Sequence, residues 1–107
     1  MRGFQITFFT HQDRRHEGKP LGEWLILLAR QMGLSGATLM SATEGFGASG
    51  KLHSARFFDL ADQPIEILVT VSEQQAEKLF ERLRAEGLHL AFVKTAVEFG
   101  RIGEDDR

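Results

Sequence analysis

A glycine-rich segment followed by two cations contains the residue types in this sequence that are best suited to bind a ligand. It reads Gly45-Phe46-Gly47-Ala48-Ser49-Gly50-Lys51, and Arg56 follows five residues later. Glycines lack a Cβ and let backbone amides turn toward an anion, while Lys51 and Arg56 add positive charge. The segment therefore predicts a site for a phosphate-bearing ligand. The alternative is that the glycines only let a surface loop turn and the cations only solvate it.

The segment matches one phosphate-binding motif fully and another nearly, but its context argues against both. A GxGxxG fingerprint must open a helix within a strand-helix-strand unit, and residues 53–58 show no helical pattern. A GxxxxGK motif needs a hydroxyl at its last position to hold magnesium, where this chain has Leu52. Neither a dinucleotide fingerprint nor a P-loop is predicted.

The remaining polar residues give little support for catalysis or metal binding. The four histidines lack a metal-ligand spacing and there is no cysteine, so solvated or capping roles are favoured over a metal site; they are His11, His16, His53 and His89. There is no nucleophile elbow, no Ser-His-Asp spacing and no evident pair of carboxylates, so no enzyme and no cofactor is predicted. Glu66 lies among apolar neighbours and is either solvent-facing or paired and partly buried.

Composition predicts one folded domain over residues 1–107. The chain is 42% hydrophobic and 26% charged, with a formal charge of -2 and no long run of like charges, which argues against a nucleic-acid partner. Its longest apolar run, Trp24 to Ala29, is far shorter than the roughly 20 residues that cross a bilayer, and residues 1–10 do not have the pattern of a signal peptide. A cytoplasmic protein without membrane insertion is expected.

Hydrophobic periodicity predicts four strands and two helices that could position these residues. Apolar residues alternate in the strands and recur at helical spacing in the helices, and Ser72 with Gln75 forms a capping-box pattern. The last strand is expected to point Val93 and Val97 inward. The predicted strands are 4–9, 36–43, 64–71 and 91–99, the helices 20–32 and 72–86, the loops 11–19 and 44–59, with further strand near 55–58 and a polar tail over 100–107.

This order of elements is the α+β, ferredoxin-like βαββαβ arrangement, with a four-stranded antiparallel sheet and both helices on one face. The opposite face is expected to mix polar with apolar side chains, namely Glu66, Thr70 and Lys94 with Leu68, Phe92 and Phe9. Such a face would be an exposed apolar patch in a monomer. We therefore expect a homo-oligomer in which a second subunit covers part of it.

Long stretches of the chain resemble the PII-like proteins grouped as domain of unknown function 190. The stretch from Gly18 to Gly47, GKPLGEWLILLARQMGLSGATLMSATEGFG, is similar to that family's first helix, second strand and glycine turn. The stretch KLHSARFFDL from Lys51 to Leu60 and the ending EGLHLAFVKTAVEF are similar as well. The resemblance covers residues 4–99 and implies a PII-like homotrimer.

A more distant likeness is to the nitrogen regulatory PII signal-transduction proteins, trimers that bind adenine nucleotides between subunits and signal through a loop. Gly45-Phe46-Gly47 resembles the base of that loop, Ile65-Glu66-Ile67 resembles the start of their third strand, and residues 101–106 are similar to their C-terminal stretch. The resemblance implies that Glu66 and Arg101 lie near the ligand, with Arg101 able to reach a phosphate.

The chain departs from the PII pattern at three places. Small residues, Ala48 and Ser49, stand where PII proteins have a glutamine that helps to hold magnesium and 2-oxoglutarate. The turn from Gly87 to Leu90 is short and has no lysine, and the chain has no tyrosine that could be modified. Sensing of 2-oxoglutarate and tyrosine modification are therefore not expected.

Together, the residues and the resemblance predict a non-enzymatic trimeric regulator that binds a small anion, an adenine nucleotide, between subunits. Ligand binding would change the order of the 44–59 loop and so the surface shown to a partner protein. Two alternatives stay open: a cofactor-free enzyme of the dimeric ferredoxin-like barrel type, and a trimeric divalent-cation tolerance protein with His53 as ligand. The predicted ligand-binding residues are Gly45, Phe46, Gly47, Gly50, Lys51, Arg56, Glu66 and Arg101.

Overall fold

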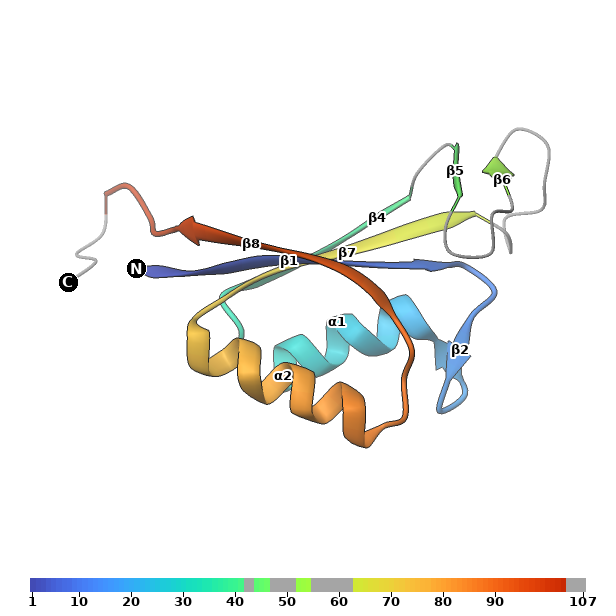
Figure 1. Cartoon of the computed structure of the whole chain (residues 1–107), viewed down its shortest axis with the longest axis horizontal. Helices are drawn as coiled ribbons and strands as arrows, with labels where there is room; N and C mark the ends of the chain where they lie inside the picture. The colour runs from blue at the N-terminus through green and yellow to red at the C-terminus, as the bar shows by residue number, and fades with distance from the viewer. Residues whose placement is uncertain (42–43, 47–51, 55–62, 104–107) are drawn as a thin grey trace.

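The computed structural model describes residues 1–41, 44–46, 52–54 and 63–103, and in this part each helix is both preceded and followed by strands (Figure 1). In chain order the elements are β1 (Arg2–His11), β2 (Arg15–His16), β3 (Lys19–Pro20), α1 (Leu21–Gln31), β4 (Gly36–Ser41), β5 (Glu44–Phe46), β6 (Leu52–Ser54), β7 (Pro64–Val71), α2 (Glu73–Ala85) and β8 (Ala91–Glu98).

The main sheet has the strand order β4-β7-β1-β8, and each neighbouring pair is antiparallel. Both helices lie on the same face of this sheet (Figure 1). The central strand β1 places Ile6 opposite Val69 of β7 on one side and opposite Lys94 of β8 on the other. The ferredoxin-like α+β fold predicted from the sequence is confirmed.

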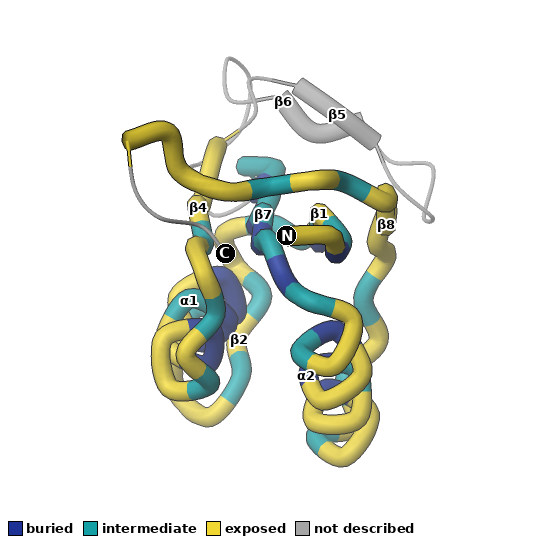
Figure 2. Tube along the Cα trace, turned by 90° about the vertical axis from the view of Figure 1, so that its left-hand side faces the viewer, coloured by how far each residue is buried: buried dark blue, intermediate teal, exposed yellow. Residues whose placement is uncertain are grey.

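The core lies between the sheet and the two helices, because alternate residues of the strands and one face of each helix are apolar. Along β7 every second residue is buried, as strict alternation predicts for a sheet covered on one face. Figure 2 shows the buried stretches of both helices on the side toward the sheet. The buried hydrophobic residues are Ile6, Phe8, Leu21, Trp24, Leu25, Leu28, Ala29, Ile65, Ile67, Val69, Val71, Ala76, Leu79 and Leu83.

The second helix begins and ends where its sequence signals place it. Ser72 Oγ accepts a hydrogen bond from the Gln75 amide at 3.2 Å, and the Gln75 side chain accepts one from the Ser72 amide at 2.9 Å. This reciprocal pair is a capping box and satisfies amides that have no partner within the helix. After the helix, Gly87 has φ +71°, a conformation that glycine adopts without strain.

Two short strand pairs lie within segments predicted to be loops. β2 and β3 form a hairpin in which His16 opposes Lys19, so the prediction of a plain loop over 11–19 is wrong. The two residues between them, Glu17 (φ 51°) and Gly18 (φ 79°), have the positive φ values of a tight hairpin turn. β5 and β6 pair within the segment 44–59. The strand predicted near 55–58 and residues 42–43 lie outside the described residues.

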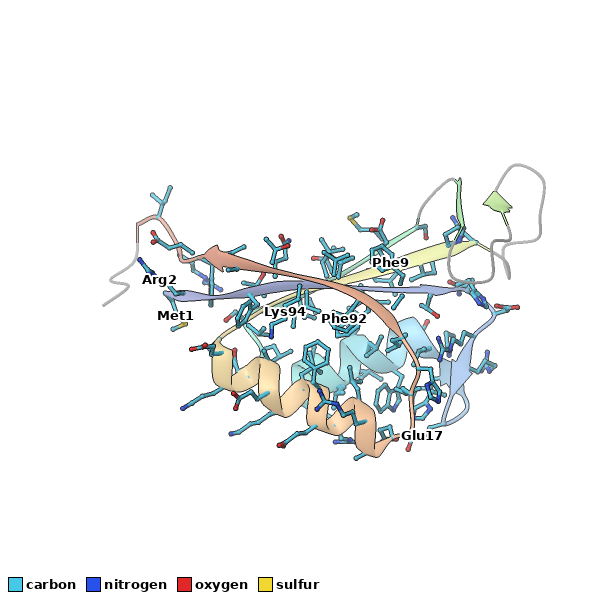
Figure 3. All side chains as sticks on the ribbon, viewed as in Figure 1. Met1, Arg2, Phe9, Glu17, Phe92 and Lys94 are labelled. Atoms are coloured by element: carbon cyan, nitrogen blue, oxygen red, sulfur yellow. The ribbon has the colours of Figure 1, made fainter. Side chains whose placement is uncertain are left out.

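The prediction for the last strand had the two faces of the strand reversed. Because directly opposed residues of an antiparallel pair share a face, Val93, which opposes Thr7, lies on the face without helices, and so does Val97. Val93 is 53% exposed and therefore does not point into the core. Phe92 and Lys94, predicted on the uncovered face, lie on the helix side, as Figure 3 shows.

Candidate functional site

The face of the sheet that carries no helix holds Glu66 within a row of apolar side chains. Glu66 opposes Phe9 of β1 and Met40 of β4, and all three share this face. Phe9 is 38% and Met40 44% exposed, while Glu66 is half-buried. In the next row Leu68 lies between Thr7 and Thr38. The predicted placement of Glu66, Leu68 and Phe9 on the uncovered face is confirmed; sequence reasoning missed Met40, because β4 consists of small and apolar residues without clear alternation.

The glycine segment leaves the sheet next to this row. Ser41, the last residue of β4, opposes Ile65, so the chain departs one residue beyond Met40 and returns just before Glu66. Of the predicted ligand residues here, Gly45 and Phe46 lie in β5, where they oppose His53 and Leu52 of β6, and β5 contacts β7. The other four lie outside the described residues; they are Gly47, Gly50, Lys51 and Arg56.

Arg101 lies at the opposite end of the sheet from Glu66. It follows β8, whose residue Glu98 opposes Arg2, whereas Glu66 opposes Phe9. The seven residue-to-residue steps from Arg2 to Phe9 span roughly 24 Å at about 3.4 Å per step. The structure therefore does not bring Glu66 and Arg101 of one chain together.

Backbone hydrogen bonds extend the sheet beyond β8 toward Arg101. The Phe99 amide donates to the Met1 carbonyl at 2.8 Å, and the Met1 amino group donates to the Phe99 carbonyl at 2.9 Å. The chain therefore leaves the sheet beside Met1, two residues before Arg101, at the end of the sheet away from β5 and β6 (Figure 1). Its side chain is exposed at this end.

A second polar cluster, missed from the sequence, joins the β2–β3 hairpin to both helices. His16 Nε2 lies 2.8 Å from Glu86 Oε1, and the His16 ring meets the edge of Trp24 with centroids 4.5 Å apart. Trp24 Nε1 donates to Glu17 Oε1 at 2.9 Å, and Arg82 Nε donates to Glu86 Oε2 at 2.9 Å. His16 is only 17% exposed in its side chain, so it is not the solvated histidine predicted from spacing.

Charge and hydrogen bonding in this cluster favour a structural tie. The hydrogen bond from His16, followed by the one from Arg82, lowers the pKa of Glu86 from its ordinary value of 4.5. His16, Glu17 and Glu86 could each offer one metal ligand, and these atoms lie within 4.8 Å of one another. Each ligand atom already has a protein partner, however, so the cluster holds the hairpin against α2 without needing an ion.

Within the part of the chain that the structure describes, neither α1 nor α2 has the length and apolar character of a membrane-spanning helix.

Comparison with known proteins identifies the family of this chain. The model of the DUF190 family, described as Uncharacterized ACR, matches residues 3–98. A UPF0166 protein from Aquifex aeolicus (strain VF5) is 28% identical over 80 residues, which are 74% of this chain and 76% of that protein.

Solved structures with a similar fold are PII-like proteins. One is CPII, a nitrogen regulatory PII-like protein from Thiomonas intermedia K12, bound to ADP, AMP and bicarbonate; it has a TM-score of 0.69 and 18% identity, with 94% of this chain and 91% of CPII covered. Another is a candidate PII-like signalling protein from Thermus thermophilus, with a TM-score of 0.59 and 22% identity over 90% of this chain and 85% of that one. The family match covers most of the sequence, and this chain therefore belongs to the DUF190 family and has the PII-like fold.

Proposed function

We propose that this protein is a non-enzymatic PII-like regulator that binds an adenine nucleotide between the subunits of a homotrimer. In this proposal the nucleotide lies on the uncovered sheet face near Glu66, next to the glycine segment. Binding changes the arrangement of segment 44–59, which presents a different surface to a partner protein. Gly47, Gly50, Lys51 and Arg56 supply amides and charge for the phosphates.

The observation that carries the proposal is the half-buried carboxylate of Glu66 within an uncovered apolar row. Phe9 and Met40 flank it, and Val93 lies exposed on the same face. Apolar side chains gathered on a sheet face favour association, because burial removes them from water. A flat, polar-edged base can pack on such a row while it hydrogen-bonds to Glu66.

The separation of Glu66 from Arg101 supports a site shared between subunits. The two residues lie at opposite ends of one sheet, so a ligand can meet both only when a second copy supplies its Arg101. Arginine is well suited to bind phosphate in such a position. The similar CPII structure, bound to ADP and AMP, supports an adenine nucleotide as the ligand.

Isothermal titration calorimetry with AMP, ADP and ATP tests the nucleotide, and sedimentation velocity on the same sample tests the assembly. We expect a trimer and saturable heat with at least one nucleotide. Glu66→Gln and Arg101→Gln should each weaken binding about tenfold, which corresponds to about 1.4 kcal/mol. Glu77→Gln, an exposed position on α2, is the matched control and should bind as the unaltered chain does. A folded trimer that gives no heat with any nucleotide would exclude the nucleotide part.

Sedimentation velocity, together with a calorimetric titration with copper or zinc, separates the two alternatives. A dimer in sedimentation would favour the cofactor-free enzyme of the ferredoxin-like barrel type over the regulator. A trimer that binds copper or zinc, and loses this affinity in His53→Ala, would favour the divalent-cation tolerance protein. We expect neither result.

A further inference from the structure

We propose that a groove between β8 and α2 binds a small organic carboxylate that carries an apolar ring or short chain. The groove has a volume of about 290 Å³. Its lining consists of six apolar side chains and two cations: Phe8, Phe80, Leu83, Leu88, Leu90, Phe92, Arg84 and Lys94. It lies on the helix side of the sheet, so the inference does not depend on the proposed nucleotide site on the other face.

Lys94 lies on the helix side of the edge strand β8, in register with core residues of the sheet, and is exposed. It opposes Ile6 on the helix side of β8, and the equivalent positions on β1 and β7, Ile6 and Val69, belong to the core. Its Nζ lies 4.1 Å from the centroid of the Phe4 ring. Among the described residues no carboxylate lies within ion-pairing distance of Lys94. Lys94 therefore contributes a positive charge to the groove that no acidic side chain of the described residues neutralises.

Arg84 brings a second positive charge to the same ring. Its Cζ lies 5.9 Å from the Phe80 centroid, and Lys94 Nζ lies 5.7 Å from it. Arg84 likewise has no ion-pair partner among the described residues, and no acidic side chain lines the groove. Two cations with no acidic side chain in the lining give the groove a positive charge, which an anionic group can neutralise.

The aromatic side chains that line the groove, Phe8, Phe80 and Phe92, favour a ligand with an apolar ring or chain. Phe80 meets Phe92 in a T-shaped arrangement with centroids 4.9 Å apart and lies 6.0 Å from Phe8. Phe92 remains 49% exposed and would lose water contact when a ring or alkyl chain packs on it. Figure 3 shows Phe92 and Lys94 on the same side of β8, toward α2. A ligand whose apolar group packs on these rings and whose carboxylate lies beside a cation of the lining satisfies both features.

Titration of the ¹⁵N-labelled full-length protein with 3-phenylpropionate, followed by NMR, tests the proposal. The matched probe is 3-phenylpropionamide, which has the same shape without the charge. We expect saturable shifts at groove residues such as Leu88 and Phe92, and about tenfold weaker binding of the amide. Equal affinity for acid and amide would overturn recognition of a carboxylate, and shifts confined to the uncovered sheet face would overturn the location.

Two lysine variants complete the test. Lys94→Met keeps an apolar side chain of similar length and should weaken 3-phenylpropionate binding about tenfold while the spectrum stays that of a folded protein. Lys78→Met, on the exposed side of α2 and outside the groove lining, should bind as the unaltered chain does. Unchanged binding by Lys94→Met would overturn the proposal. Groove shifts that depend on protein concentration without any ligand would also overturn it, because they would identify a second copy of the chain as the occupant.

Discussion

His16 and Glu86, 70 positions apart in the sequence, meet with 2.8 Å between His16 Nε2 and Glu86 Oε1. The contact holds the β2–β3 hairpin against the C-terminal end of α2. Both side chains are less than one-fifth exposed, and Arg82 donates to the second carboxylate oxygen. The tie therefore fixes the segment from which α1 begins.

The stability contributed by Glu86 should depend on pH. Its folded-state pKa is lowered from 4.5 by hydrogen bonds, first from His16 and then from Arg82. A lowered pKa means that the stabilisation is present above pH 4.5 and is lost as the pH falls through the folded-state pKa. We expect Glu86→Gln to be less stable than the unaltered chain at neutral pH, with the difference shrinking in acid. Urea unfolding across this range measures it.

The control for this prediction is Glu77→Gln, at an exposed glutamate of α2 that has no ion pair among the described residues. Its small effect should not follow the same pH dependence. If the free-energy difference between Glu86→Gln and the unaltered chain were the same at neutral and acid pH, the tie would not be electrostatic.

Gly3 should tolerate no side chain. A Cβ built on Gly3 overlaps the carbonyl oxygen of Val71, a backbone atom that cannot move without disturbing the β1–β7 pairing. We expect Gly3→Ala to lower the free energy of unfolding by about 1–3 kcal/mol or more. Gly36→Ala is the control, because no atom lies within 4 Å of its Cβ position. Thermal unfolding of both variants gives the comparison, and equal melting temperatures would contradict the prediction.

The capping box of α2 should contribute measurably to stability. Ser72→Ala removes the hydroxyl that accepts from the Gln75 amide, and such losses cost about 1 kcal/mol, within about 0.5–2 kcal/mol. Ser35→Ala, at an exposed bend, should change stability by less than about 0.5 kcal/mol. Chemical denaturation measures both. A Ser72→Ala protein as stable as Ser35→Ala would show that the cap is dispensable.

A charge on the uncovered sheet face should disrupt the proposed assembly. Val93 is 53% exposed in the single chain, so Val93→Glu leaves the core intact but places a carboxylate in the proposed interface. We expect sedimentation velocity to show dissociation. Leu27→Glu, 40% exposed on the helix side, should assemble normally. Were Val93→Glu to remain trimeric, this face would not be the interface.

Most of the fold follows from local patterns that the sequence shows directly. The alternation in β7 predicted a strand, and the pair Ser72–Gln75 predicted the start of α2. Both predictions succeeded because each signal is contained within a few neighbouring residues. β8 was reversed because it carries apolar residues on both faces, and the lysine that seemed to mark the outer face, Lys94, is accommodated over the Phe4 ring on the inner one. Periodicity cannot distinguish the two faces of such a strand.

The site was predictable only in part. The position of Glu66 on the uncovered face follows from β7 alone, and its neighbours Phe9 and Met40 depend on which strands pair. The partnership of His16 with Glu86 depends on a contact across 70 positions, which no local pattern encodes. The Glu17–Gly18 pair was the one local signal of the hairpin, and the adjoining strands are too short to show alternation.

The strand order β4-β7-β1-β8 has a consequence for synthesis on the ribosome. The first strand to emerge, β1, is a central strand, and both of its partners come from the second half of the chain. During translation β1, with its apolar residues Ile6 and Phe8, therefore remains unpaired until β7 has emerged. One edge of β1 stays unpaired until β8 has left the exit tunnel. The sheet is therefore completed only after β8 has emerged, and the folding rate is limited by these distant pairings.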